Sequence, residues 1–246
     1  GSMPWPETAP NRLVRALGRL LDAERPPRVL PEVEEFFRRM AQVAPEAEAG
    51  GYGDIGGALR DPTARARILA HRHSAAILRT TFAITMLRGS EKRNVIPPEA
   101  VAEIDCRMLA GEDPDEIVRW VREVVADEHV TVEVTAPPKQ PNLSPPDTEM
   151  YKHLTRTLAE RAPGVVVAPE IMTGFTDNWV FRERGLQGYG FGPFILDEGE
   201  LARIHGNDER ISLENVRAGV RAYTEMLLGM AGAAGAGDAF RVPRPA

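Results

Sequence analysis

The spacing of apolar residues predicts helices over much of the N-terminal third of the chain. Further helical patterns cover residues 31–44 and 61–78, and the glycine-rich stretch 48–57 (EAGGYGDIGG) between them predicts a loop. The first helix is expected to begin near Pro10, because proline tolerates the first helical turn. Its apolar side chains recur at the spacing of one buried helix face: Leu13, Val14, Leu17, Leu20 and Leu21.

Alternating apolar and polar residues predict strands in the middle of the chain. The two clearest runs are 80–87 (TTFAITML) and 99–109 (EAVAEIDCRML), joined by a loop. A capped helix, DPDEIVRWVREVVA, follows, with Asp113 as its cap, and the run 130–136 (VTVEVTA) predicts a third strand. The order helix, strand, strand, helix, strand predicts a ferredoxin-like α+β domain that lacks its first strand and carries a helical insertion.

A proline-rich connector (PPKQPNLSPPD) predicts a domain boundary near residue 140. Beyond it helices alternate with apolar runs at 165–174 and 186–194, which predict strands of an α/β layer. Two strands are too few for an independent sheet, so this segment is expected to complete a sheet whose other strands lie elsewhere. The predicted domains are 1–140 and 141–230, and the Gly/Ala-rich tail at 231–246 is expected to be flexible.

Composition limits the classes of function that fit. The 246 residues are 43% apolar and 27% charged, with a net charge of −6 and no basic run, so neither nucleic acid nor a membrane surface is an expected partner. No apolar run approaches the ~18 residues of a membrane span. Cys106 is the single cysteine, which excludes an internal disulfide and favours a cytoplasmic setting. A small molecule is therefore the expected partner.

Arg107 is the clearest candidate binding residue on physical grounds. Strand alternation sends Ile104 and Cys106 toward the helices, where the thiol is expected to be buried and inert, and sends Arg107 to the opposite face. On an open face, a guanidinium can hold a carboxylate by two parallel hydrogen bonds. The alternative is a surface ion pair of Arg107 with Asp105 or Glu103.

Four stretches closely resemble, in order and spacing, the second half of the dinuclear-zinc aminoacylase and carboxypeptidase superfamily. They are KRNVIPPEAVAEIDCRMLAGED, TGFTDNWVFRERG, YGFGP and RIHGNDERIS. The superfamily includes acetylornithine deacetylase, succinyl-diaminopimelate desuccinylase, carboxypeptidase G and carnosinase. Its N-terminal catalytic half carries a His-x-Asp pair, a bridging Asp and a Glu-Glu pair, which do not occur here. The resemblance thus implies the lid domain plus the C-terminal catalytic segment only.

The resemblance assigns a metal role to one histidine. His205 matches the last zinc ligand of a site that holds two ions in the intact enzyme, so the site in this chain is expected to be incomplete. Glu209 matches an acidic position of the same motif, where it could orient His205, although a solvated loop acid is the alternative.

The resemblance also assigns substrate contacts. Arg107 matches the lid residue that grips the terminal carboxylate of the substrate, and Asn94 matches a polar residue near the substrate carbonyl, with a simple turn residue as the alternative. Gly174 and Thr176 match positions that line the substrate, whereas Asp177 is expected to cap a helix.

The resemblance implies a zinc-dependent hydrolase that cleaves amide bonds in N-acyl amino acids or small peptides with a free carboxylate. Its lid is expected to form a homodimer, and the chain as given is expected to be an inactive part of a longer enzyme. The alternative is a non-catalytic dimerisation or binding module derived from the same family.

Overall fold

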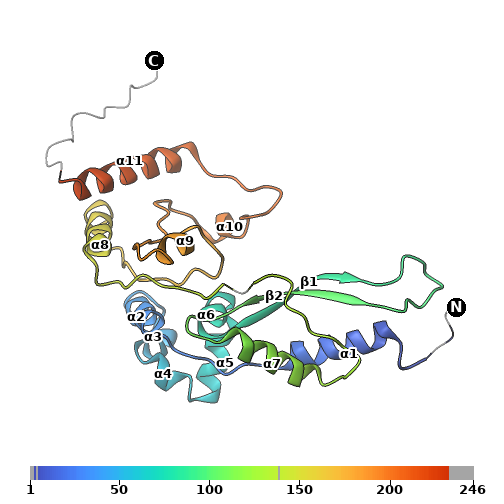
Figure 1. Ribbon diagram of the computed structural model, residues 1–246. Helices are drawn as coiled ribbons and strands as arrows, with labels where there is room; N and C mark the ends of the chain where they lie inside the picture. Colours follow the sequence, from blue (N-terminus) through green and yellow to red (C-terminus); the bar gives the residue numbers. More distant parts are fainter. Residues whose placement is uncertain (1–2, 4, 138, 233–246) are drawn as a thin grey trace. The chain divides into compact units, whose positions relative to one another are not determined.

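The computed structural model describes residue 3, residues 5–137 and residues 139–232. The chain divides into two compact units, shown with their elements in Figure 1. The first unit contains Gly1–Leu143 and Glu170–Leu186, and the second contains Ser144–Pro169 and Gln187–Ala246. The predicted tail at 231–246 lies almost entirely outside the described residues.

Two helices cover one face of a two-stranded antiparallel sheet in the first unit. Helices α1 (Ala9–Asp22) and α7 (Pro114–Val125) lie beside strands β1 (Thr81–Arg88) and β2 (Val101–Arg107) (Figure 1). The buried side chains between the helices are Ala16, Leu20, Val121 and Val125, with Phe82 and Ile104 of the strands packed against them. These four elements confirm the predicted helices and strands in this part of the chain.

Local sequence signals explain where the two helices begin. The Thr8 side chain accepts a hydrogen bond from the Asn11 amide at the start of α1, and Asp113 accepts one from Asp115 at the start of α7. Both helices have a proline in the first turn, where its missing N–H costs nothing. Helix α7 ends at Val125 and is followed by Ala126, which has the left-handed conformation common at helix C-termini.

A bulge in β1 changes which side chains face the helices. Ile84 pairs with Ile104, but Met86 pairs with Glu103, so Thr85 is an extra residue and its hydroxyl donates to the Glu103 carbonyl at 3.2 Å. Before the bulge, Phe82 faces the helices; beyond it, Met86 shares the open face with Glu103. Beyond the bulge, Leu87, which pairs with Ala102, is on the helix side but is 66% exposed, so the outer half of β1 has little helix cover.

The helical insertion between α1 and β1 has its own core. It contains α2 (Pro31–Met40), α3 (Glu46–Gly53), α4 (Ile55–Ala58), α5 (Pro62–Ala70) and α6 (Arg72–Leu78). The buried residues of its hydrophobic cluster are Leu30, Val33, Phe37, Ile55, Leu59, Ile68, Ile77 and Leu78.

The prediction of a loop at 48–57 is wrong, because α3 and α4 occupy this stretch. Asp54 caps α4 by accepting a hydrogen bond from the Gly57 amide at 2.8 Å. Tyr52 packs against Phe37, with ring centroids 5.1 Å apart, and Ile55 is 1% exposed. Burial of these two side chains offsets the helix cost of the glycines, which is ~1 kcal/mol each.

The predicted strands at 130–136, 165–174 and 186–194 are also wrong: β1 and β2 form the one sheet found among the described residues. A strand needs a neighbouring strand for its backbone groups, and none pairs with these segments among the described residues. Side chains bond to some of their backbone groups instead. Arg122 donates to the Val132 carbonyl at 3.1 Å, and the Gly188 amide donates to the Ser144 hydroxyl at 3.0 Å. The described structure is thus helix-rich with a small antiparallel sheet, and it contains no α/β layer.

The second unit is built on two packed helices, α8 (Glu149–Arg161) and α11 (Leu213–Met230), with the short α10 (Glu198–Leu201) between them in sequence. Leu154, Ala222 and Met226 are buried. The His153 ring lies against Gly229, and its Nε2 is 3.1 Å from the Met226 carbonyl oxygen. Because a Cβ on Gly229 would lie 2.6 Å from the His153 ring, this contact needs glycine.

Glycine-to-alanine substitutions at two helical positions are expected to change stability in opposite directions. Gly229→Ala would displace the His153 ring and should destabilise the chain by about 1–2 kcal/mol, the scale of overpacking. Gly18→Ala in α1, where a Cβ meets nothing within 4 Å, should stabilise it by about 0.5–1 kcal/mol through helix propensity. Urea unfolding monitored by circular dichroism measures the free energy of unfolding of both variants. An increase in this free energy for Gly229→Ala would contradict the packing of His153 against Gly229.

Candidate functional site

The residues predicted to form the site lie in both units. Asn94, Arg107, Gly174 and Thr176 belong to the first unit, whereas His205 and Glu209 belong to the second. Each group is therefore described within its own unit.

Arg107 lies on the sheet face opposite the helices, as predicted. It ends β2 and pairs across the sheet with Thr81 at the start of β1. Its guanidinium donates to the Asp105 carboxylate at 2.7 Å, which is the surface ion pair considered as the alternative role. The Arg107 side chain is 47% exposed, and a guanidinium has five N–H donors, so it can also donate to a carboxylate of another molecule.

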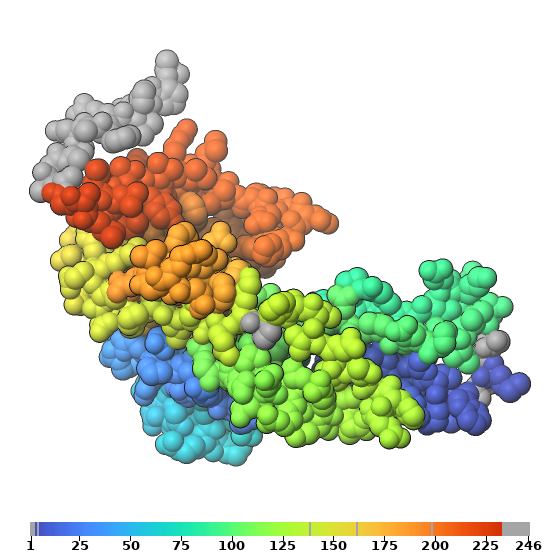
Figure 2. All heavy atoms as spheres, viewed as in Figure 1, coloured from blue at the N-terminus to red at the C-terminus, as the bar shows by residue number. Residues whose placement is uncertain are grey.

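Asn94 lies at the other end of the hairpin. It is an exposed turn residue in the loop that joins β1 to β2. The green atoms of this hairpin segment lie at the surface in the view of Figure 2. Arg107 ends β2 at the far side from that loop, and seven strand residues span about 20 Å. The hairpin itself therefore does not bring Asn94 and Arg107 together.

The loop Thr173–Asp177 precedes α9 (Asn178–Arg182), which belongs to the first unit. The Thr176 carbonyl accepts from the Trp179 amide at 3.1 Å, and Gly174 is exposed, with a Cβ there meeting Met172 at an ordinary 3.8 Å. Asp177 stands at the N-cap position, but its side chain makes no capping hydrogen bond, so the predicted capping role is wrong. Its helical backbone angles (φ −62°, ψ −14°) differ from the extended conformation of a side-chain cap.

An aromatic and cationic cluster, which was not predicted from the sequence, surrounds this loop. The Lys139 ammonium lies 4.2 Å from the Phe175 ring centroid and 5.2 Å from that of Trp179. The Trp179 indole donates to the Gln140 carbonyl at 2.8 Å. The aromatic residues next to TGFTD were a signal, but no spacing rule links them to a lysine in the connector.

His205 lies in a tight turn of the second unit. It has a φ of 63°, in the left-handed region, where a residue other than glycine stores backbone strain. The Gly206 amide donates to the Arg203 carbonyl at 2.8 Å, and a Cβ on Gly206 would lie 2.9 Å from that oxygen. Glu209 accepts from the His205 backbone amide at 3.1 Å, so it holds the turn through the main chain.

The described parts of the chain contain no group of three or more His, Cys, Asp or Glu side chains that could hold a metal ion. A catalytic zinc takes about three protein ligands and keeps one open position. These residues therefore do not fit a complete zinc site, and His205 could supply one imidazole ligand.

His71 and His73 have separate partners. The His71 ring is 3.9 Å from Glu48, and the His73 ring is 3.3 Å from Glu170 and packs on Phe36. They do not converge on a common ligand, which agrees with their separation by two positions, since side chains two apart do not share a helix face.

The prediction of a buried Cys106 is wrong, because this residue is exposed on β2. Its position near the end of the sheet leaves the helix cover incomplete. Desolvation by surrounding protein atoms, together with the negative charges of Glu112 and Asp105, nevertheless raises the pKa of the thiol to about 11. A thiol with so high a pKa is a poor nucleophile near neutral pH.

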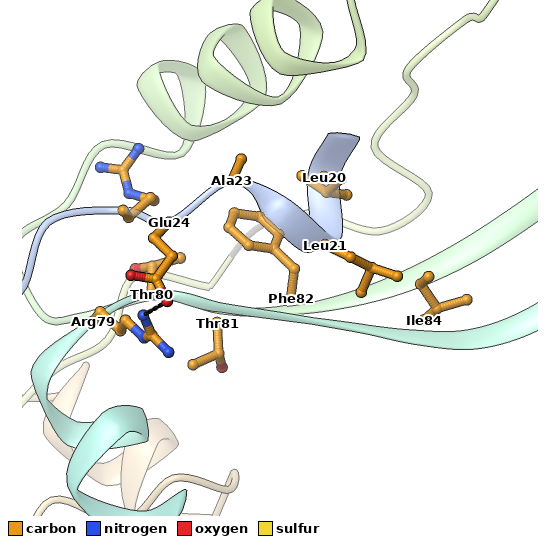
Figure 3. Close-up of a pocket in the computed structure, with 10 residues that line it drawn as sticks. Leu20, Leu21, Ala23, Glu24, Arg79, Thr80, Thr81, Phe82 and Ile84 are labelled. Carbon is orange, nitrogen blue, oxygen red and sulfur yellow. Dashed lines mark ion pairs between the residues drawn. The ribbon is translucent and has the colours of Figure 1, made fainter. Parts of the chain in front are cut away.

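A hollow of about 190 Å³ lies between the end of α1 and the start of β1. In Figure 3, Leu20 and Leu21 approach Phe82 and Ile84, and an ion pair of 2.9 Å joins Glu24 to Arg79 at its rim. None of the residues predicted to bind substrate or metal lines this hollow.

Comparison with known proteins identifies the family. The peptidase dimerisation domain family matches residues 9–133, about half of the chain. The chain is 32% identical over 153 residues to a probable carboxypeptidase S-like 2 of Dictyostelium discoideum, and 34% identical over 153 residues to the N-fatty-acyl-amino acid synthase/hydrolase PM20D1 of Xenopus tropicalis. Each match covers 62% of this chain and 30% of the relative. Mouse aminoacylase-1 is 28% identical over 171 residues, with 68% of this chain and 41% of the relative covered.

The matched domain and the names of these relatives all point to one family of hydrolases. The chain belongs to the M20 peptidase family, within the aminoacylase and carboxypeptidase superfamily. It spans about a third of the length of the curated relatives that it matches. No solved structure matches it significantly. Among the described residues, no helix is long and apolar enough to cross a membrane.

Proposed function

We propose that this chain forms the lid and the C-terminal catalytic segment of a metal-dependent hydrolase. Its substrates are N-acyl amino acids or small peptides with a free carboxylate, whose amide bond is cleaved. In this proposal residues 1–140 form a ferredoxin-like lid and 141–230 belong to the catalytic domain, whose sheet and remaining ligands come from sequence outside this chain. The matched region makes up about a third of each relative, which supports a contribution from sequence outside this chain.

The observation that carries the proposal is Arg107 within the matched domain. It is a half-exposed arginine on the open sheet face, whereas Ile104 of the same strand packs toward the helices. A guanidinium in this partly exposed position can bind the planar carboxylate of a substrate, whereas a guanidinium in a buried ion pair could not. His205 would provide a zinc ligand, Asn94, Gly174 and Thr176 would contact substrate, and Glu209 would hold the His205 turn.

Two measurements test the proposed activity. The complete reading frame should encode a His-x-Asp motif and a Glu-Glu pair, and the protein expressed from it should hydrolyse N-acyl amino acids. Absence of these motifs together with no hydrolysis of any N-acyl amino acid would favour a non-catalytic binding module.

The cytoplasmic location stays a prediction.

Exchange of Arg107 for lysine is expected to weaken substrate binding. Lysine keeps the charge but loses the two-pronged geometry, so KM in the protein from the complete reading frame should rise by the equivalent of about 1.5–3 kcal/mol, with folding nearly unchanged. The matched control is Arg88→Lys. Arg88 lies on the same sheet face, at the end near the loop, and forms an ion pair with Glu103. Equal kcat/KM for wild type and Arg107→Lys on every accepted substrate would refute this role.

The lid is expected to form a homodimer. Each described strand has one neighbour, so each has an open edge, and open edges favour association with another chain. Sedimentation equilibrium at micromolar concentration should give twice the 27.0 kDa mass of the chain. A clean monomer at that concentration would count against the dimer.

A further inference from the structure

The connector after the matched domain is fixed to the loop Thr173–Asp177 by several contacts within the first unit. The Lys139 ammonium lies over both Phe175 and Trp179, whose ring centroids are 6.1 Å apart. A cation over an aromatic face is attracted by the negative charge density of that face. Lys139 thus holds two rings at once.

Hydrogen bonds from side chains to main-chain carbonyls extend this attachment along α9. The Trp179 indole donates to the Gln140 carbonyl at 2.8 Å, and the Asn142 amide group donates to the Trp179 carbonyl at 3.2 Å. The Arg182 guanidinium donates to the Asn142 carbonyl at 3.2 Å. The connector therefore lies along the short helix, with Lys139 at the end that is nearest to the loop.

The two aromatic residues flank Thr176 in the chain. Phe175 precedes it directly, and the Trp179 amide donates to its carbonyl at 3.1 Å. Phe175 is 48% exposed, so part of its ring lies outside the packed interior, and its contacts with Lys139 and Trp179 contribute to its orientation. Fixing both rings consequently restricts the backbone on both sides of Thr176.

We propose that Lys139 is a positioning residue, which sets the conformation of the substrate-lining loop Thr173–Asp177 through the Phe175 and Trp179 rings. The role of that loop rests on the proposed function. Lys139 contacts no substrate in this account. Its effect is on how well the loop is prepared for binding, so it should change KM more than kcat.

Lys139→Met tests the proposal, because methionine keeps the length and apolar character of the side chain but removes the charge. In hydrogen exchange measured by mass spectrometry on the protein from the complete reading frame, peptides covering 170–186 should exchange at least about 5-fold faster than in wild type. KM for N-acyl amino acids should rise about 5-fold or more with kcat changed less than about 2-fold. Lys139→Arg should restore both values, since guanidinium also binds aromatic faces.

Lys152→Met is the matched control, since it removes the same charge from α8, where Lys152 pairs with Glu149. It should leave exchange in 170–186 and KM unchanged. Unchanged exchange in Lys139→Met would overturn the attachment itself, and faster exchange with unchanged KM would overturn the positioning role. A wild-type protein inactive on all N-acyl amino acids would instead overturn the proposed function, and with it the substrate part of this proposal.

Discussion

Replacing His205 with alanine is expected to lower amide hydrolysis by the protein from the complete reading frame at least about 100-fold. Loss of even an outer partner of a metal ligand costs 10–100-fold, and loss of a ligand should cost more. The chain holds this imidazole in a strained turn, with φ of 63° and the backbone amide bonded to Glu209. Such strain at an exposed loop position is typical of functional sites.

The effect on chemistry can be separated from an effect on folding. His205→Asn removes the imidazole while asparagine tolerates the left-handed conformation, so it should lose activity without loss of stability. His129→Ala, at an exposed loop histidine, should keep full activity. Activity of His205→Ala and His205→Asn within about 2-fold of wild type would exclude His205 as a metal ligand.

Phe37→Ala is expected to destabilise the helical insertion by about 3–5 kcal/mol, the cost of removing a fully buried phenylalanine. Phe37 is 1% exposed, and its ring packs edge-on to Phe36 at 5.3 Å and against Tyr52 at 5.1 Å. The substitution would leave a cavity, and the neighbouring helices could close it only by giving up other contacts. Urea unfolding monitored by far-ultraviolet circular dichroism measures the change.

Val43→Ala provides the comparison for Phe37→Ala. Val43 is 55% exposed just beyond α2, so its truncation should change stability by less than about 0.5 kcal/mol. A loss of under about 1 kcal/mol in Phe37→Ala would show that the five short helices do not share the core described.

Helices with local signals could be predicted from the sequence. The Thr8 cap and Pro10 place the start of α1, and Asp113 with Pro114 places that of α7, because these contacts join residues a few positions apart. Strands β1 and β2 were also predictable from alternation. The bulge at Thr85 was not, since it depends on the register between two strands.

Features that depend on distant partners could not be predicted. The stretch 48–57 is helical because Tyr52 and Ile55 pack into a core formed by other helices. The runs 130–136, 165–174 and 186–194 have strand-like composition, but a strand also needs a neighbouring backbone, which composition does not supply.

The candidate site shows the same limit. Motif spacing selected Arg107 and His205 one at a time, but it gave no information on the Asp105 ion pair or the strained turn. Lys139 lies more than thirty positions from Phe175 in the sequence, so their contact has no local signal. Exposure of Cys106 likewise depends on where the helices end over the sheet.

Isothermal titration calorimetry with zinc tests the central claim. This claim is that His205 is one ligand of a metal site whose other ligands lie outside this chain. Complete zinc sites of four ligands are worth about 10–16 kcal/mol, so a single ligand contributes about 3–4 kcal/mol. This corresponds to a dissociation constant near millimolar for the 246-residue chain. The protein from the complete reading frame should bind zinc far more tightly than this chain does. Its His205→Ala variant should bind zinc less tightly than its wild type. Stoichiometric micromolar binding by the 246-residue chain, abolished by His205→Ala, would contradict the account.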